Sequence, residues 1–125
     1  METILSATIQ EATNVFISNL LASEAFICYH QSQTLLDHDS KAQALLNQLS
    51  QAQAEMRKKQ TVNSLTKDEI GSLRALQTQV QANDVIKGYA NSQQNVIEFL
   101  REINDEINQL LGIDFASFTK RSGCC

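Results

Sequence analysis

The stretch DVIKGYANSQQNVIEFLREINDEINQLL, residues 84–111, carries the clearest pattern in the chain. Its apolar side chains recur at alternating intervals of three and four residues, the spacing of one face of an α-helix. The positions on that face are Ile86, Tyr89, Gln93, Val96, Leu100, Ile103, Ile107 and Leu110. The pattern predicts one long helix that ends before Gly112, since glycine suits the left-handed conformation that follows many helices.

The length of this helix indicates a partner. At 1.5 Å per residue it would be about 40 Å long, which is more than a compact bundle of 125 residues requires. Part of its apolar face would then have no partner within one chain. We therefore predict that the eight positions form an interface in a homo-oligomer or hetero-oligomer. Gln93 either sets register or partner choice in that interface, or lies at its edge in water.

The composition favours helices in the rest of the chain as well. There is no proline and there are only four glycines, and both residues disfavour helix interiors. Apolar residues at helical spacing predict four more helices, the first beginning near Leu5. We predict an all-α fold of about five helices with coiled-coil-like packing, in one domain over residues 1–118. The helices over 39–60 and 84–111 are expected to form a long antiparallel hairpin.

Polar residues mark the expected helix starts. Ser23 can cap the second helix, and either Asp37 or Asp39 the third. The sequence TKDE, Thr66–Glu69, has the pattern of a capping box, in which the threonine hydroxyl and the glutamate carboxylate satisfy backbone groups of the first turn. Asn83 can cap the long helix. Cys28 lies among apolar neighbours, and we expect it to be a small buried hydrophobe.

Charge and composition argue against several classes of protein. The net charge of −4 disfavours general nucleic-acid binding and a polybasic membrane surface. No run of eighteen apolar residues predicts a transmembrane helix, and no basic stretch followed by an apolar one predicts a signal peptide. We expect a cytoplasmic protein with reduced thiols.

No motif of a metalloprotease, a di-iron bundle, a phosphate-binding loop or a serine hydrolase occurs, and we predict no catalytic residues. Three charged clusters are candidate sites. The acidic one could hold a metal only with ligands from a second helix, and Asp37–Asp39 could also bind a metal. Arg57–Lys59 could contact phosphate. In each case a solvated helix face or helix end is the simpler interpretation. The acidic cluster comprises Glu98, Glu102, Asp105 and Glu106.

The chain ends in KRSGCC, residues 120–125, and we expect residues 119–125 to be a flexible tail. A 4Fe-4S cluster requires four thiolates, and Cys124 and Cys125 supply two. A second chain or a partner with cysteines could complete the set, and zinc would accept the same ligands. A disulfide, a lipid attachment or no essential role are the other interpretations.

Several stretches resemble the YlbF/YmcA family of small bacterial regulatory proteins. They are DSKAQALLNQL at 39–49, LQTQVQANDVIKGY at 76–89, SQQNVIEFLREINDEI at 92–107 and LLGIDF at 110–115. The resemblance covers about residues 5–118. Asp84 stands where the family commonly has proline, and either residue suits the first turn of a helix.

This resemblance implies an all-helical, non-catalytic protein that forms dimers or hetero-oligomers with related helical proteins. It implies a regulatory or adaptor role in competence, biofilm formation and sporulation. The implied partners are a YaaT-like protein and ribonuclease Y, whose mRNA processing the complex tunes, and the implied cofactor is an iron–sulfur cluster shared between chains. The alternative is a small iron–sulfur or other metal or redox carrier that uses Cys124 and Cys125 on its own.

Overall fold

The computed structural model describes residues 5–119, and in that range the chain is helical apart from short connections. Its helices are α1 (Ala7–Leu21), α2 (Glu24–Asp37), α3 (Ser40–Thr61), α4 (Lys67–Ala82), α5 (Asp84–Leu111) and α6 (Phe115–Thr119). The all-α prediction is confirmed. The long helix predicted over 84–111 is also confirmed, as a single element of 28 residues. The short helix α6 was not predicted.

Side-chain caps set where the helices begin. Ser23, Asp39, Thr66 and Asn83 each precede a helix and accept a hydrogen bond from the backbone N–H three residues further on. Such a cap satisfies one of the N–H groups that the first turn leaves unpaired. These four predicted caps are confirmed, and of the two candidates for α3 the structure selects Asp39 rather than Asp37. Ser6 caps α1 in the same way.

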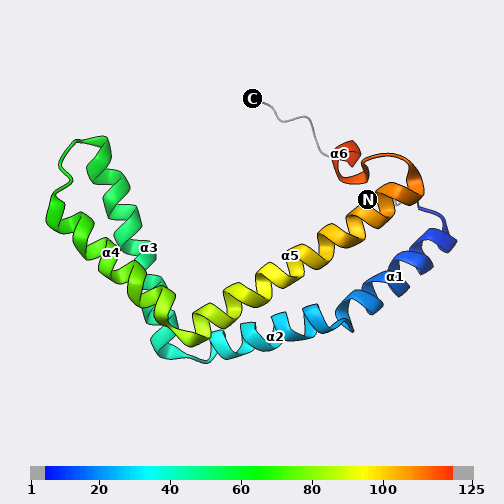
Figure 1. The fold of residues 1–125 in the computed structure, drawn as a ribbon, viewed down its shortest axis with the longest axis horizontal. Coiled ribbons are helices and arrows are strands. Elements are labelled where there is room, and N and C mark those ends of the chain that lie inside the picture. Colours follow the sequence, from blue (N-terminus) through cyan, green and yellow to red (C-terminus); the bar gives the residue numbers. More distant parts are fainter. Residues whose placement is uncertain (1–4, 120–125) are drawn as a thin grey trace.

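The helices form two antiparallel pairs that meet at a corner, so that the chain has the shape of a V (Figure 1). One arm consists of α3 and α4. In the other arm α2 packs along α5, and the order of their ring contacts shows that the two run antiparallel. Phe26 of α2 meets Phe99 of α5, whereas Tyr29, later in α2, meets Tyr89, earlier in α5.

The prediction that the helices over 39–60 and 84–111 pair with each other is therefore wrong. The first of them, α3, packs against α4, because only residues 62–66 connect the two and a short connection favours antiparallel neighbours. Between α4 and α5 only Asn83 intervenes. It has an extended backbone (φ −74°, ψ 121°) and ends one helix while it caps the next. The chain turns there, so α5 leaves the first arm and runs back along α2 (Figure 1).

The core of the single chain is small. Among residues 5–119 the buried apolar side chains are Leu36, Ala42, Leu73, Val80 and Val96, and no large side chain is fully buried. Helix α1 buries none of its residues. Cys28 is exposed, so its predicted burial is wrong. Cys28 lines an open hollow between α2 and α5, which leaves its side chain in water.

Candidate protein-interaction surfaces

The contact between α2 and α5 extends along the long helix from Tyr89 to Phe99. The Tyr29 and Tyr89 hydroxyls form a hydrogen bond of 3.1 Å, and the rings of Phe26 and Phe99 meet edge to face with centroids 6.4 Å apart. The hydrogen bond with Tyr29 raises the pKa of Tyr89, and burial adds to the effect. Val96 is buried on the same face. The part of α5 up to Phe99 thus has its partner within the chain.

The eight predicted interface positions divide along the helix. Val96 is buried, and the half-buried positions are Ile86, Tyr89, Ile103 and Ile107. Gln93 is exposed, as are Leu100 at 41% and Leu110 at 79%. Beyond Val96 the apolar face of α5 therefore continues with two large side chains in solvent. That these positions contact another chain remains a prediction.

The exposed large apolar side chains gather at one end of the molecule. Of the sixteen in the described residues, six lie within residues 5–21 and seven within 97–118. We call these two segments together the apolar end. They comprise α1, the second half of α5 and α6, which lie near one another at the open end of the α2–α5 arm (Figure 1). Exposed large apolar side chains gathered in this number mark an interaction site.

A polar clasp fixes α6 against α5. Gly112 adopts the predicted left-handed conformation (φ 71°), and its N–H donates to the Asn108 carbonyl at 2.8 Å. The Asn108 side-chain oxygen accepts from the Phe115 N–H at 2.7 Å. Asp114 accepts from the Ser117 hydroxyl at 2.6 Å, and this bond holds the pKa of Asp114 below its ordinary value. The clasp positions Phe115 and Phe118 with their rings exposed.

A shallow hollow of about 300 Å³ lies between α3 and α4 near the tip of their arm. Apolar side chains and charged side chains of both signs line it. The apolar residues are Ala52, Met56, Leu65, Leu73 and Leu76, and the charged ones are Glu55, Lys59, Asp68 and Glu69. Sequence reasoning did not identify this surface. The signal for it was present, because both helices carry apolar stripes and a capping box lies between them.

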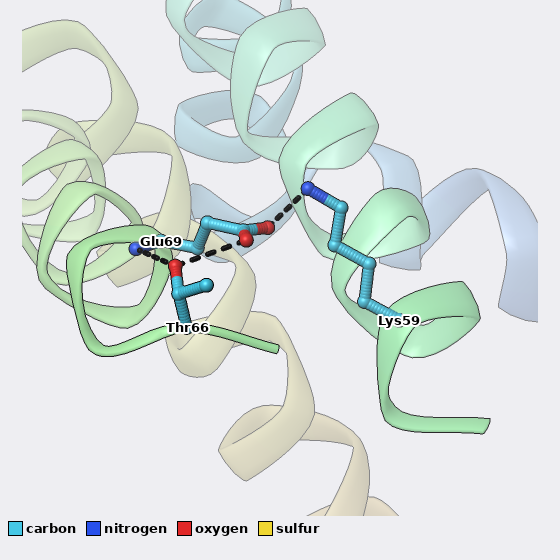
Figure 2. A network of polar contacts seen from close by, with 3 residues as sticks. All are labelled: Lys59, Thr66 and Glu69. Atoms are coloured by element: carbon cyan, nitrogen blue, oxygen red, sulfur yellow. Dashed lines mark hydrogen bonds and ion pairs between the residues drawn. The ribbon is translucent and has the colours of Figure 1, made fainter. Parts of the chain in front are cut away.

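The predicted capping box is part of a network at this tip (Figure 2). The Thr66 hydroxyl accepts from the Glu69 N–H at 3.2 Å and donates to one Glu69 carboxylate oxygen at 3.0 Å. The other carboxylate oxygen accepts from the Lys59 ammonium. The bond from Lys59, followed by that from Thr66, holds the pKa of Glu69 below its ordinary value. The network therefore ties the end of α3 to the start of α4.

The side chains of the other charged clusters do not come together to form a site. Asp39 caps α3, and the His38 ring lies 2.8 Å from the Thr34 carbonyl, as expected of helix-end residues. Arg57 and Lys58 are exposed, while Lys59 belongs to the network at the tip. Among residues 5–119 no group of three or more histidine, cysteine, aspartate or glutamate side chains could hold a metal ion.

Glu98 and Glu102 line an open hollow between α2 and α5 together with Glu24 and Cys28.

Cys124 and Cys125 lie outside the described residues, so the structure does not place them. Over residues 5–119, no helix has the length and apolar character that crossing a lipid bilayer would take.

A sequence-family model described as "Control of competence regulator ComK, YlbF/YmcA" matches residues 9–111, most of the chain. The chain belongs to the YlbF/YmcA family. A search of curated proteins found no match. Among solved structures, the fold is similar to one described as the "X-ray Crystal Structure of Bacillus subtilis RicA in complex with RicF". The TM-score is 0.77 with 16% sequence identity, and the match covers 86% of this chain and 96% of the other. At that identity the likeness shows the shared fold, and the YlbF/YmcA membership rests on the sequence match.

Proposed function

We propose that this YlbF/YmcA protein is a non-catalytic regulatory adaptor that acts by binding other proteins. The observation that carries this proposal is the apolar end, where thirteen large apolar side chains are exposed. A folded chain rarely leaves so many together in water unless another molecule covers them. The family description, a control protein of a competence regulator, fits such a role.

The exposed side chains of the apolar end indicate which class of partner fits it. Helix α1 carries a single charged residue, Glu11, and offers exposed side chains such as Phe16 and Ile17. Aliphatic and aromatic side chains at helical spacing are complementary to the apolar face of another helix. The solved structure of similar fold is described as RicA in complex with RicF, which is a protein complex. A helical protein is therefore the partner class that we propose.

At a finer level, we propose that the adaptor works with a YaaT-like protein and tunes mRNA processing by ribonuclease Y. Regulation of competence, biofilm formation and sporulation would follow from that activity. Support comes from the match to the YlbF/YmcA family over residues 9–111. The protein's regulatory effect then comes from the assembly and not from a reaction that it catalyses itself.

The shared 4Fe-4S cluster stays a prediction. Cys124 and Cys125 are two thiolates, and the third cysteine, Cys28, is exposed on α2. A cluster with four cysteine ligands therefore requires at least one more chain with cysteines. Anaerobic purification of the complex, with iron and sulfide analysis, tests this for the full chain and for Cys124→Ser/Cys125→Ser. Equal iron content in both preparations would contradict the prediction.

Affinity capture from the source cell tests the adaptor role. The full chain is compared, under anaerobic conditions, with a chain that ends at Ser122, and mass spectrometry identifies the bound proteins. We expect the full chain to capture a YaaT-like protein and ribonuclease Y. Recovery of both by the shortened chain would make the helical body the binding surface. Their absence from every capture would overturn the finer proposal.

A further inference from the structure

The hollow between α3 and α4, which we call the tip hollow, has a lining with a net negative charge. Three carboxylates and one ammonium line it, those of Glu55, Asp68, Glu69 and Lys59. The ammonium of Lys59 is paired with Glu69. The exposed residues Glu55 and Asp68 therefore contribute two negative charges that this pair does not balance.

The negative charge is confined to one side of the α3–α4 pair. A second hollow, of about 270 Å³, is lined by one cation, Arg57, and by the amides of three glutamines. Glu55 and Arg57 are two residues apart on α3, so their side chains point about 200° apart around the helix. Met56 and Leu73 line both hollows and therefore lie between them.

The tip hollow has room for an apolar anchor. Leu73 is buried there, and Ala52, Met56, Leu65 and Leu76 are half-buried. Its volume of about 300 Å³ is at the lower end of the range for ligand pockets, which suits one or two side chains rather than a whole helix. Met56 is unbranched and adaptable, so it can shift to fit the side chain that enters.

The tip hollow is remote from the apolar end. It adjoins the connection between α3 and α4 over residues 62–66, at the tip of one arm, whereas the apolar end is the open end of the other arm (Figure 1). A protein that binds the apolar end therefore leaves the tip hollow accessible. The adaptor thus has two surfaces at which it could hold two different proteins.

We propose that the tip hollow binds a basic amphipathic helix of a second partner protein. One apolar side chain of that helix enters the hollow and supplies most of the affinity. Lysine or arginine neighbours of the anchor pair with Glu55 and Asp68, and such complementary charge orients the partner. The same carboxylates repel the phosphates of a nucleic acid or a lipid head group. This inference rests on the proposed function, because it gives the adaptor a further binding surface.

A library of helical peptides displayed on phage tests the chemistry of the partner. The library is first depleted on purified Ser72→Trp and then selected on the unaltered full chain. Ser72 is exposed and lines the tip hollow, so an indole there fills the hollow without a change of charge. Peptides that bind the apolar end are removed by the depletion, since the variant retains that end. We expect the enriched peptides to carry lysine or arginine three or four residues from an apolar anchor, because such positions share a helix face.

Fluorescence anisotropy with the best peptide measures the contribution of charge. We expect Glu55→Lys/Asp68→Lys to weaken binding about tenfold. The matched control is Asp105→Lys/Glu106→Lys, which makes the same change of net charge at exposed positions of α5 and should leave the Kd unchanged. NMR spectra of the isotopically labelled chain should show the largest shifts on adding the peptide within residues 52–76, which contain the lining of the hollow.

Several outcomes would overturn the proposal. They are a selection in which no peptide survives the depletion, enriched peptides without basic residues, an unchanged Kd for Glu55→Lys/Asp68→Lys, and NMR shifts confined to the apolar end. Capture of a YaaT-like protein and of ribonuclease Y tests the adaptor role separately. A failed capture beside a successful selection would overturn that role and leave the tip hollow as a binding surface, whereas the reverse result would overturn the tip hollow alone.

Discussion

At the level of single residues, Thr66 connects the two helices of the α3–α4 arm. Its hydroxyl caps α4 and also donates to the carboxylate of Glu69, which binds Lys59. We expect Thr66→Ala to lower the free energy of unfolding by about 1 kcal/mol, the usual cost of losing a cap. Thr66→Ser keeps the hydroxyl and should change it little. Urea denaturation at one fixed protein concentration measures both, and equal losses in the two variants would contradict the assignment.

Glu69 should make the stability of the arm depend on pH. The Lys59 ammonium and the Thr66 hydroxyl hold its pKa below the ordinary value, so the folded state binds a proton more weakly than the unfolded state. The stabilisation is therefore present above the unfolded pKa and is lost as the pH falls through the folded one, that is, below about pH 4 to 5. Thermal melts between pH 7 and 3 should show a smaller loss for Glu69→Gln than for the unaltered chain.

Glu106→Gln is the control for that experiment, since Glu106 is exposed on α5. It should keep the pH dependence of the unaltered chain. If both glutamine variants gave the same curve, the pH dependence would not originate in the network at the tip of the arm.

The residue scale also shows what local sequence determines. The caps at Ser23, Asp39, Thr66 and Asn83 depend on side chains within three residues of one another, and all four were predictable. The exposure of Cys28 depends on how α2 packs against α5, which leaves an open hollow at Cys28. Apolar neighbours in sequence do not determine that, because adjacent residues on a helix point 100° apart.

At the level of the element, α5 contains Gly88 and is followed by Gly112, and only Gly112 needs to be glycine. Gly112 ends the helix at φ 71°, a conformation that costs alanine roughly 1–2 kcal/mol. Gly88 lies inside the helix, and a Cβ added there meets no atom within 4 Å. We expect Gly112→Ala to destabilise the protein by about 1 kcal/mol and Gly88→Ala to stabilise it by about 0.5–1 kcal/mol. Chemical denaturation should give changes of opposite sign, and a gain in stability for both would show that Gly112 is not held in the left-handed conformation.

The bounds of a helix were predictable where a cap residue marked each of its ends. Asn83 and Gly112 delimit α5, and the predicted range 84–111 matches the structure. Helix α6 was missed because its five residues are too few for a periodic pattern, although Asp114 and Ser117 supply a capping signal. The pairing of helices was not predictable from periodicity. An apolar stripe shows that a helix has a partner, whereas the connection lengths around Asn83 determine which helix that partner is.

At the level of the whole molecule, two arms meet at a corner and leave one end of the longer arm apolar (Figure 1). This shape explains why the length of α5 led to the prediction of a partner outside the chain. The part of α5 up to Phe99 packs on α2 within the chain, and the end of α5 extends past the part that α2 covers. The position of the interface does not identify the partner, since the same apolar face suits a second copy of this chain and a related helical chain.

If two copies share the apolar end, stability must depend on protein concentration. Unfolding of a dimer releases two chains, so a tenfold increase in concentration adds about 1.4 kcal/mol to its stability. For about 250 residues this should raise the melting temperature by roughly 3–6 °C. Phe16→Glu/Leu110→Glu should melt at a lower temperature that does not change with concentration. Val62→Glu, at a site 70% exposed on the other arm, should behave like the unaltered chain. Calorimetry over two decades of concentration decides the matter, because a melting temperature that is constant for the unaltered chain is incompatible with a dimer as the folded state.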